Sequence, residues 1–271
     1  MAILEPFALA IAFLLSYIYD FFASSAFSIA ILTVVINVII FPLTLRQTRS
    51  TKRMQDAQSD IKALQKKHKD NKEELNKAMA AMYKEKGINP LGCILPLIVQ
   101  MPIWFALFRV LREPLSFIPG TSLLFKDLEN STSLTFFNMD LQIPPSEVSE
   151  WIERVPYLVL ILFVILTALY QQQQITKKSN NSNNPQAQQM QMIGKVMPIF
   201  FGFISWTLPT GLVVYFLTGN IFRIGQQALI VKLDDREETK KENTKNEENE
   251  QQNDNPVQEN PRKNRKKRRR K

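Results

Sequence analysis

Long apolar runs alternate along the chain with strongly charged stretches. A helix needs about 20 mostly apolar residues to cross a hydrocarbon core of roughly 30 Å. The fourth of five such runs is short and bounded by prolines, so we expect it to be tilted or buried among helices that satisfy its ends. The five runs predict an all-α integral membrane fold with spans at residues 24–45, 91–111, 154–172, 196–209 and 211–232.

The apolar run at residues 1–23 has two interpretations. It carries Glu5 near its start and Asp20 near its end, with Tyr17 and Tyr19 close by. If it crossed the membrane, only a short link would remain to turn the chain into the next span. We therefore favour an amphipathic helix lying on the outer membrane surface, although the sequence also leaves a sixth span open.

The segment 46–90 is rich in charge and in helix-forming residues. Proline and glycine are absent until Gly87, and a polar break lies near residue 70. This pattern predicts two helices in an antiparallel hairpin. Met54, Met79 and Met82 belong to a thin apolar stripe on its arms. The stripe either holds the hairpin together or receives varied apolar segments of a partner, because thioether side chains adapt to irregular surfaces.

The charges of the connecting segments predict the orientation of the spans. Basic residues outnumber acidic ones in 46–90, and the reverse holds in 112–153, the predicted extracytoplasmic loop. The loop 173–195 carries three lysines and no acid. Because cytoplasmic loops carry the excess of Lys and Arg, we expect the N-terminus outside and the C-terminus inside. Five spans satisfy this pattern, and six would break it at one end.

Composition excludes several kinds of site. The single cysteine, Cys93, cannot form an internal disulfide, and the single histidine, His68, lies among lysines without a neighbouring ligand, so no metal site is expected. No phosphate-binding loop is present. We therefore predict no catalytic residue and no cofactor. The N-terminus lacks the basic region of a secretory signal and the features of a transit peptide, which makes a bacterial plasma membrane the simplest location.

Polar side chains inside the predicted spans are the candidates for function, because they are costly in lipid. At about 1.5 Å per residue, Asn37 and Arg223 both lie roughly 12–14 Å from the cytosolic ends of their helices. If their two faces meet, they form a polar pocket in which Arg223 is the positive charge. Alternatively, Arg223 extends to the lipid headgroups and the amides only bond neighbouring helices. The candidate set is Thr33, Asn37, Gln100, Tyr215, Phe216, Asn220, Arg223 and Gln227.

Three strings cover almost the whole predicted membrane core. They are FPLTLRQTRSTKRMQ (Phe41–Gln55), NPLGCILPLIVQMPIWFALF (Asn89–Phe108) and MPIFFGFISWTLPTGLVVYFLTGNIFRIGQQ (Met197–Gln227). In order and spacing they resemble YidC/Oxa-type membrane protein insertases, in a compact form without the large extracytoplasmic domain of some members. The resemblance implies a five-helix core around a hydrophilic groove that is open to the cytosol and to lipid. It also implies that the chain inserts nascent membrane proteins, alone or with the Sec translocon.

One position departs from the family. Many members carry an arginine in the first span, where the motif places Asn37 in this chain. The matching position of the fifth span is commonly uncharged in the family, whereas this chain has Arg223 there. If the groove charge is functional, it is therefore either missing in this chain or supplied elsewhere, and our hypothesis is that Arg223 supplies it from the fifth span.

The segment 233–271 is charged, rich in Asn and Gln and free of aromatic residues, so we expect disorder. The resemblance implies that its basic end is a counterpart of ribosome-contacting tails, which would bind ribosomal RNA electrostatically; anionic lipid is the alternative partner. The basic residues are Arg262, Lys263, Arg265, Lys266, Lys267, Arg268, Arg269, Arg270 and Lys271.

A small polytopic transporter or channel is the rival functional class. Such folds usually show internal repeats or more spans, and neither is evident here. An intramembrane serine hydrolase is excluded because the only histidine lies in the predicted cytosolic hairpin. We expect no small-molecule substrate.

Overall fold

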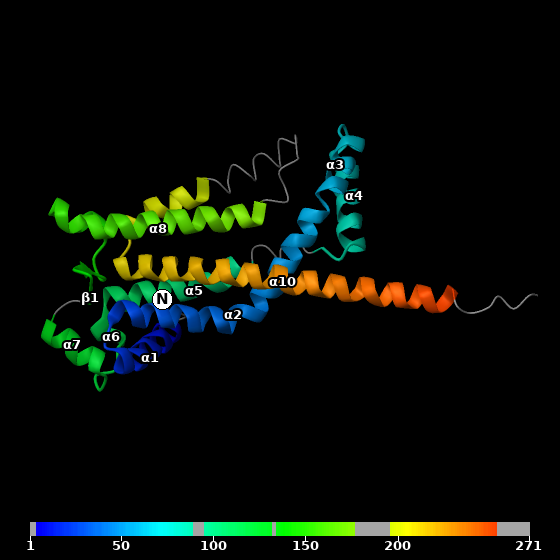
Figure 1. Cartoon of the computed structure of the whole chain (residues 1–271). Helices are drawn as coiled ribbons and strands as arrows, with labels where there is room; N and C mark the ends of the chain where they lie inside the picture. Colours follow the sequence, from blue (N-terminus) through cyan, green and yellow to red (C-terminus); the bar gives the residue numbers. More distant parts are fainter. Residues whose placement is uncertain (1–3, 89–94, 132–133, 177–195, 254–271) are drawn as a thin grey trace, which may run out of the picture. The chain divides into compact units, whose positions relative to one another are not determined.

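A computed structural model describes residues 4–88, 95–131, 134–176 and 196–253, and most of them are helical (Figure 1). The chain forms two units, Met1–Gln227 and Ala228–Lys271, and the packing described below lies within the first. The long helices are α1 Glu5–Phe22, α2 Ser25–Asp56, α5 Leu95–Arg112, α8 Trp151–Thr176 and α10 Thr210–Asn253, with a shorter apolar helix at Val196–Ser205.

Three described helices are long and apolar enough to cross a membrane. They are Glu5–Phe22, Ser25–Met54 and Trp151–Gln174. Such lengths match the requirement of the hydrocarbon core. The fold is therefore a mostly helical membrane architecture, as the sequence predicts.

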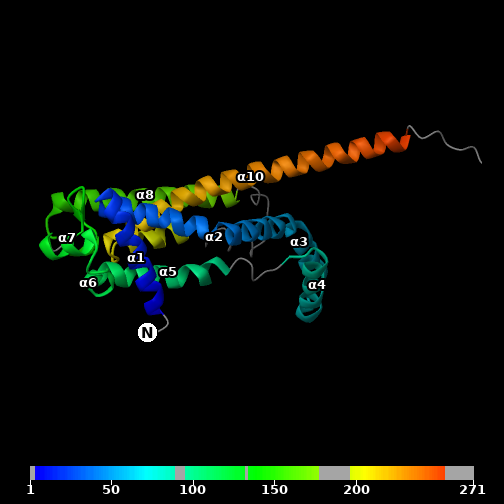
Figure 2. The same cartoon turned by 90° about the horizontal axis from the view of Figure 1, so that it is seen from below.

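Residues suited to helix ends define α1. Pro6 lies in the first turn, where its missing N–H costs nothing, and Glu5 suits the positive end of the helix dipole. The helix ends where Ala23 adopts a left-handed conformation with φ of 47° and donates its N–H to the carbonyl of Tyr19. α1 packs against α2 and α5, and Figure 2 shows it running steeply across the direction of α5.

The second helix, α2, continues unbroken to Asp56, whereas the predicted span ends at residue 45. The stretch 46–56 contains no proline or glycine, so nothing in it stops a helix. The hairpin follows as α3 Gln58–Lys67 and α4 Lys72–Glu85, which pack against each other. The predicted span and the first part of the predicted hairpin segment thus belong to one continuous helix, and the first hairpin helix begins at Gln58.

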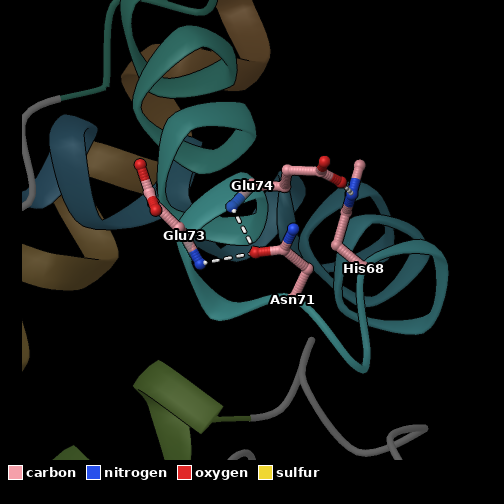
Figure 3. Close-up of polar contacts among 4 residues, drawn as sticks. All are labelled: His68, Asn71, Glu73 and Glu74. Carbon is pink, nitrogen blue, oxygen red and sulfur yellow. Dashed lines mark hydrogen bonds and ion pairs between the residues drawn. The ribbon is translucent and has the colours of Figure 1, made fainter.

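Polar contacts shape the tip of this hairpin (Figure 3). The Asn71 side-chain oxygen accepts hydrogen bonds from the backbone N–H groups of Glu73 (3.1 Å) and Glu74 (3.2 Å). It thereby satisfies two donors that have no partner within the helix. The Glu74 carboxylate also lies 3.2 Å from Nδ1 of His68, at the end of α3. Asn71 thus caps the N-terminus of α4, which begins at Lys72.

Short elements cover one end of the bundle, where α5 ends and α8 and α10 begin. The chain turns between two antiparallel strands at Phe137 and Asn138, which both have positive φ, as in a tight primed hairpin turn. The prediction for 112–153 named only a loop. We call this end of the bundle the capped end and the opposite one the loose end. The covering elements are α6 Pro114–Phe117, α7 Leu123–Ser131, β1 Thr135–Phe136, β2 Met139–Asp140 and a 3-10 helix at Pro145–Glu147.

Burial is concentrated at the capped end. Completely enclosed side chains there include Ile29, Leu32, Leu107, Leu111 and Leu212, from three helices. Toward the loose end, none of the described residues is buried at 37–50 of α2, 98–105 of α5 or 165–174 of α8. The first unit is therefore closely packed at one end and loosely packed at the other.

The tail prediction needs a correction. Residues from 233 were expected to be disordered, but α10 remains helical as far as Asn253. No proline or glycine occurs between Gln226 and Asn255, and glutamate, lysine and glutamine, which dominate there, favour helices. Residues 254–271, with all the basic tail candidates, lie outside the described part of the chain.

Candidate functional site

A side-chain hydrogen bond joins α5 and α10 near the middle of the bundle. The amide nitrogen of Gln100 donates to the hydroxyl oxygen of Tyr215. Tyr215 is almost completely buried, and Gln100 is half-buried. Because a buried polar group without a partner is costly in apolar surroundings, this bond accounts for two of the predicted residues at once.

A second link joins α10 to α8. The amide nitrogen of Asn220 lies 3.4 Å from the carbonyl oxygen of Val164 and 3.3 Å from the hydroxyl oxygen of Thr167. Its amide oxygen accepts a hydrogen bond of 2.9 Å from Nη2 of Arg223. Asn220 is therefore the residue through which Arg223 connects to a neighbouring helix.

The guanidinium of Arg223 folds back toward the start of its own helix. A Cβ built on Gly219, one turn earlier, would lie 3.4 Å from Nη2 of Arg223. An arginine that extends to headgroups at the loose end would point the other way. In this structure the charge is turned into the bundle, which argues against that alternative.

The two candidates on α2 satisfy their own helix. The hydroxyl of Thr33 donates to the carbonyl of Ile29 at 2.6 Å, and the amide of Asn37 donates to the carbonyl of Thr33 at 2.7 Å. Thr33 is completely buried at the capped end. Within the described residues, no hydrogen bond or ion pair joins Asn37 to Arg223. The structure therefore brings together the candidates of α5 and α10, but not those of α2 with them.

We call Gln100, Tyr215, Asn220 and Arg223 the polar cluster, and aromatic rings lie beside its Tyr215. The ring of Phe216 lies 6.4 Å from that of Trp104 on α5, and 6.0 Å from those of Phe201 and Tyr215. Phe216 is half-buried, so it serves partly as packing between helices. Aromatic surface therefore lies beside Tyr215 and the bond that it accepts from Gln100.

Sequence reasoning missed three polar side chains in this region, those of Thr167, Gln226 and Trp104. Thr167 bonds Asn220, although a lone hydroxyl in an apolar run gives little signal. Gln226 is buried, whereas the predicted Gln227 is half-buried. The amide nitrogen of Gln226 and the indole nitrogen of Trp104 are buried without a hydrogen-bond partner in the described part of the chain. The buried positions Tyr215, Gly219, Asn220 and Gln226 share only Asn220 with the predicted face of Phe216, Asn220, Arg223 and Gln227, and Phe216, Arg223 and Gln227 are half-buried.

The hairpin methionines pack inside the hairpin. Met82 is buried, and Met54 and Met79 pack against the same cluster as Ala57 and Ile88. This arrangement agrees with the interpretation in which the stripe holds the two helices together. It leaves the methionines little exposed surface on which to receive another chain.

No group of three or more histidine, cysteine, aspartate or glutamate side chains that could hold a metal ion occurs among residues 4–88, 95–131, 134–176 and 196–253. The chemistry that the polar cluster offers is therefore hydrogen bonding and one fixed positive charge. A guanidinium carries five N–H donors, and Asn220 takes one of them.

Residues 17–238 match the family described as 60Kd inner membrane protein. The chain is 30% identical over 237 residues to the protein named "Membrane protein insertase YidC" of Treponema denticola, which covers 84% of this chain and 38% of that protein. It is 32% identical over 222 residues to the protein of the same name from Ectopseudomonas mendocina, covering 82% and 33%. It is also 29% identical over 220 residues to the chloroplastic inner membrane protein ALBINO3 of Arabidopsis thaliana, covering 76% and 46%.

A solved structure shares the fold. It is titled "Active YidC insertase crystal structure with the first transmembrane domain resolved" and matches with a TM-score of 0.52 at 23% identity. The match covers 79% of this chain and 43% of that one. The chain therefore spans between a third and a half of the length of these relatives.

Proposed function

The chain belongs to the 60Kd inner membrane protein family, the family of the YidC/Oxa-type insertases, and from this premise we propose that it inserts other proteins into the membrane. It is an integral protein of a bacterial cell membrane, as its bacterial relatives and apolar helices show. The insertase activity is carried over from relatives that are more than twice as long. It is supported by the polar cluster on α10, which is the feature that can be tested.

In the proposed topology, five helices cross the membrane. They are the apolar parts of α2, α5, α8, the helix Val196–Ser205 and α10, with the capped end outside and the loose end in the cytosol. α1 would lie along the outer surface. Its steep crossing of α5 (Figure 2) and its contacts with α6 and α7 support that placement over a sixth span.

The decline of burial from the capped end to the loose end supports a hydrophilic groove. A bundle that is closed outside and loosely packed inside admits water and polar chain from the cytosol only. Gln100, Tyr215, Asn220 and Arg223 lie where close packing gives way to loose packing. This placement is the observation that carries the proposal, because polar groups kept within apolar helices lower the cost of bringing a client's charges partway across.

In the proposed mechanism, the polar extracytoplasmic tail of a nascent membrane protein enters the groove from the cytosol. Arg223 attracts acidic groups in that tail, at short range and in a medium of low dielectric constant. The apolar segment of the client then leaves along the lipid-facing surfaces of the helices. The protein would act by binding alone, without metal, cofactor, nucleotide or covalent step. Partners would be nascent membrane proteins, with or without the Sec translocon, and ribosomes or anionic lipids at the basic tail.

Depletion of the protein tests this function. Small single-span and double-span proteins should then fail to insert, as measured by protease protection of their extracytoplasmic tails. In cells complemented with Arg223→Ala, insertion of clients with acidic tails should fall roughly tenfold, the order expected for one charged hydrogen bond. Clients with neutral tails serve as the control.

A charge swap tests whether the position of the charge matters. The double variant Asn37→Arg with Arg223→Thr restores one arginine at a similar depth, so it should insert acidic clients as the wild type does. Normal insertion of acidic clients by Arg223→Ala alone would show that the charge of Arg223 has no part in the process.

A further inference from the structure

One buried amide lies between Arg223 and the neighbouring helix. Asn220 is 7% exposed and contacts α8 with its amide nitrogen and Arg223 with its amide oxygen. Figure 1 shows α8 and α10 both starting at the capped end and running in the same direction. Asn220 therefore joins two parallel helices at one level, and Arg223 is attached at that point.

The donors and acceptors allow only one direction for these contacts. A guanidinium donates and cannot accept, so Arg223 must face the amide oxygen of Asn220. The amide nitrogen is then left to face α8. There the hydroxyl of Thr167 donates to carbonyl oxygens of its own helix, at 2.7 and 3.0 Å, which leaves its lone pairs to accept from Asn220. The chain of bonds thus runs from Arg223 to the backbone of α8.

The same contacts explain why the arginine is turned into the bundle. Arginine near the end of a span ordinarily extends its aliphatic stem and places its charge among the headgroups. Here Asn220 supplies a partner one turn nearer the capped end, and Gly219 has no side chain to fill the space beside the guanidinium. Removing the Asn220 amide would remove the only hydrogen-bond partner that the described residues give to Arg223.

We propose that Asn220 is a positioning residue that uses its contact with Thr167 to hold the Arg223 guanidinium inside the bundle, where a client carboxylate meets it. The inference rests on the proposed insertase function and adds to it a dependence on α8. Without the Asn220 amide, the guanidinium turns toward the headgroups at the loose end. A carboxylate in the groove then finds no donor held at a fixed place.

The test uses the full chain in cells depleted of it and two matched single-span clients, one with an aspartate in its translocated tail and one with asparagine there. The measured quantity is the ratio of acidic-client to neutral-client insertion. Asn220→Ala should lower this ratio roughly fivefold and the near-isosteric Thr167→Val roughly twofold, the range of single hydrogen bonds. Thr167→Ser keeps the hydroxyl and should keep the ratio.

Thr218→Val is the matched control. Thr218 lies on α10, as Asn220 does, and the described residues show no hydrogen bond of its hydroxyl. Thr218→Val should leave the ratio unchanged. An equal loss for both clients in Asn220→Ala and Thr167→Val would overturn the inference, since Asn220 would then only hold the helices together. If Asn220→Ala does not accumulate, the pair Thr167→Val and Thr167→Ser decides.

The failure of the inference is distinguishable from that of the proposed function. If Asn220→Ala keeps the wild-type ratio while Arg223→Ala lowers it, only the positioning role is wrong. If depletion of the wild-type chain affects neither client, the insertase function fails and the positioning role with it.

Discussion

At the capped end, α5 and α10 meet through apolar side chains such as Leu111 and Leu212, whereas at mid-helix they meet through Gln100 and Tyr215. The same pair of helices therefore has two kinds of contact along its length. Apolar contacts of this kind are stable and specific, because interiors pack as closely as crystals. Polar contacts in loosely packed surroundings can exchange partners at lower cost. The comparison relates stability to the capped end and the proposed client binding to the polar contacts at mid-helix.

The largest expected effect concerns the close packing of the capped end. Leu107 is completely enclosed, whereas Ile39 at the loose end is 68% exposed. Leu107→Ala should lower the free energy of unfolding by about 2–5 kcal/mol, through lost burial and a residual cavity. Ile39→Ala should change it by about 0.5 kcal/mol or less. Unfolding in one detergent, followed by circular dichroism, measures both, and equal losses would contradict the division between the two ends.

Two glycines of α10 give a sharper version of the same comparison. A Cβ on Gly211 would lie 2.8 Å from Cδ1 of Leu111 and 3.2 Å from Cδ1 of Ile29, whereas a Cβ on Gly225 would meet nothing within 4 Å. Gly211→Ala should therefore destabilise the protein by about 1–3 kcal/mol through overpacking. Gly225→Ala should stabilise it by about 0.5–1 kcal/mol, since alanine favours a helix more than glycine does.

The midpoint of thermal unfolding distinguishes these glycine variants, because the two shifts should have opposite signs. If Gly211→Ala stabilises the protein, the capped end has space for an added methyl group. The capped end would then not be more closely packed than the loose end.

The smallest expected effects come from removing one tyrosine hydroxyl in the polar cluster and one at the capped end. Tyr215→Phe leaves the Gln100 amide without its acceptor in apolar surroundings, and should lower the free energy of unfolding by about 1 kcal/mol. Tyr19→Phe removes the 2.9 Å hydrogen bond to Asp127 at the capped end. Because Asp127 is exposed to solvent, Tyr19→Phe should lower the free energy of unfolding by about half as much as Tyr215→Phe does.

Function separates this last pair more clearly than stability. Only Tyr215→Phe should reduce insertion of acidic clients, measured by protease protection of their extracytoplasmic tails, because Tyr215 lies with Gln100 in the polar cluster whereas Tyr19 lies at the capped end. A reduction of the same size in Tyr19→Phe would show that the assay follows stability alone.

Much of this arrangement could be predicted from the sequence. Apolar runs of sufficient length specify helices in a membrane because the backbone has no other way to satisfy its polar groups there. Helical spacing also placed Asn220 near Arg223, since the contact is local. Local contacts of this kind depend only on the period of the helix, which the sequence displays directly.

The contacts between helices could not be predicted in the same way. Spacing alone does not tell which neighbour a polar face meets, so the expected meeting of Asn37 with Arg223 was no better founded than the contact of Asn220 with Thr167 that the structure shows. The continuation of α10 to Asn253 was missed for a different reason. Low hydrophobicity predicts the lack of a core, but it does not prevent a helix in a sequence rich in glutamate and lysine.

The capped end is stabilised by hydrogen bonds between residues that are distant in the sequence. Tyr19 bonds Asp127, Asp20 accepts from the N–H of Leu123, and Thr210 bonds the carbonyl of Ile143, at sequence separations of 108, 103 and 67 residues. None of them can form until both partners have been synthesised and brought to the same side of the membrane. During biogenesis the first two bonds can form once Asp127 has been synthesised, whereas the third must wait for the start of α10. A protein proposed to insert others into the bilayer would thus complete its own capped end only late in its synthesis.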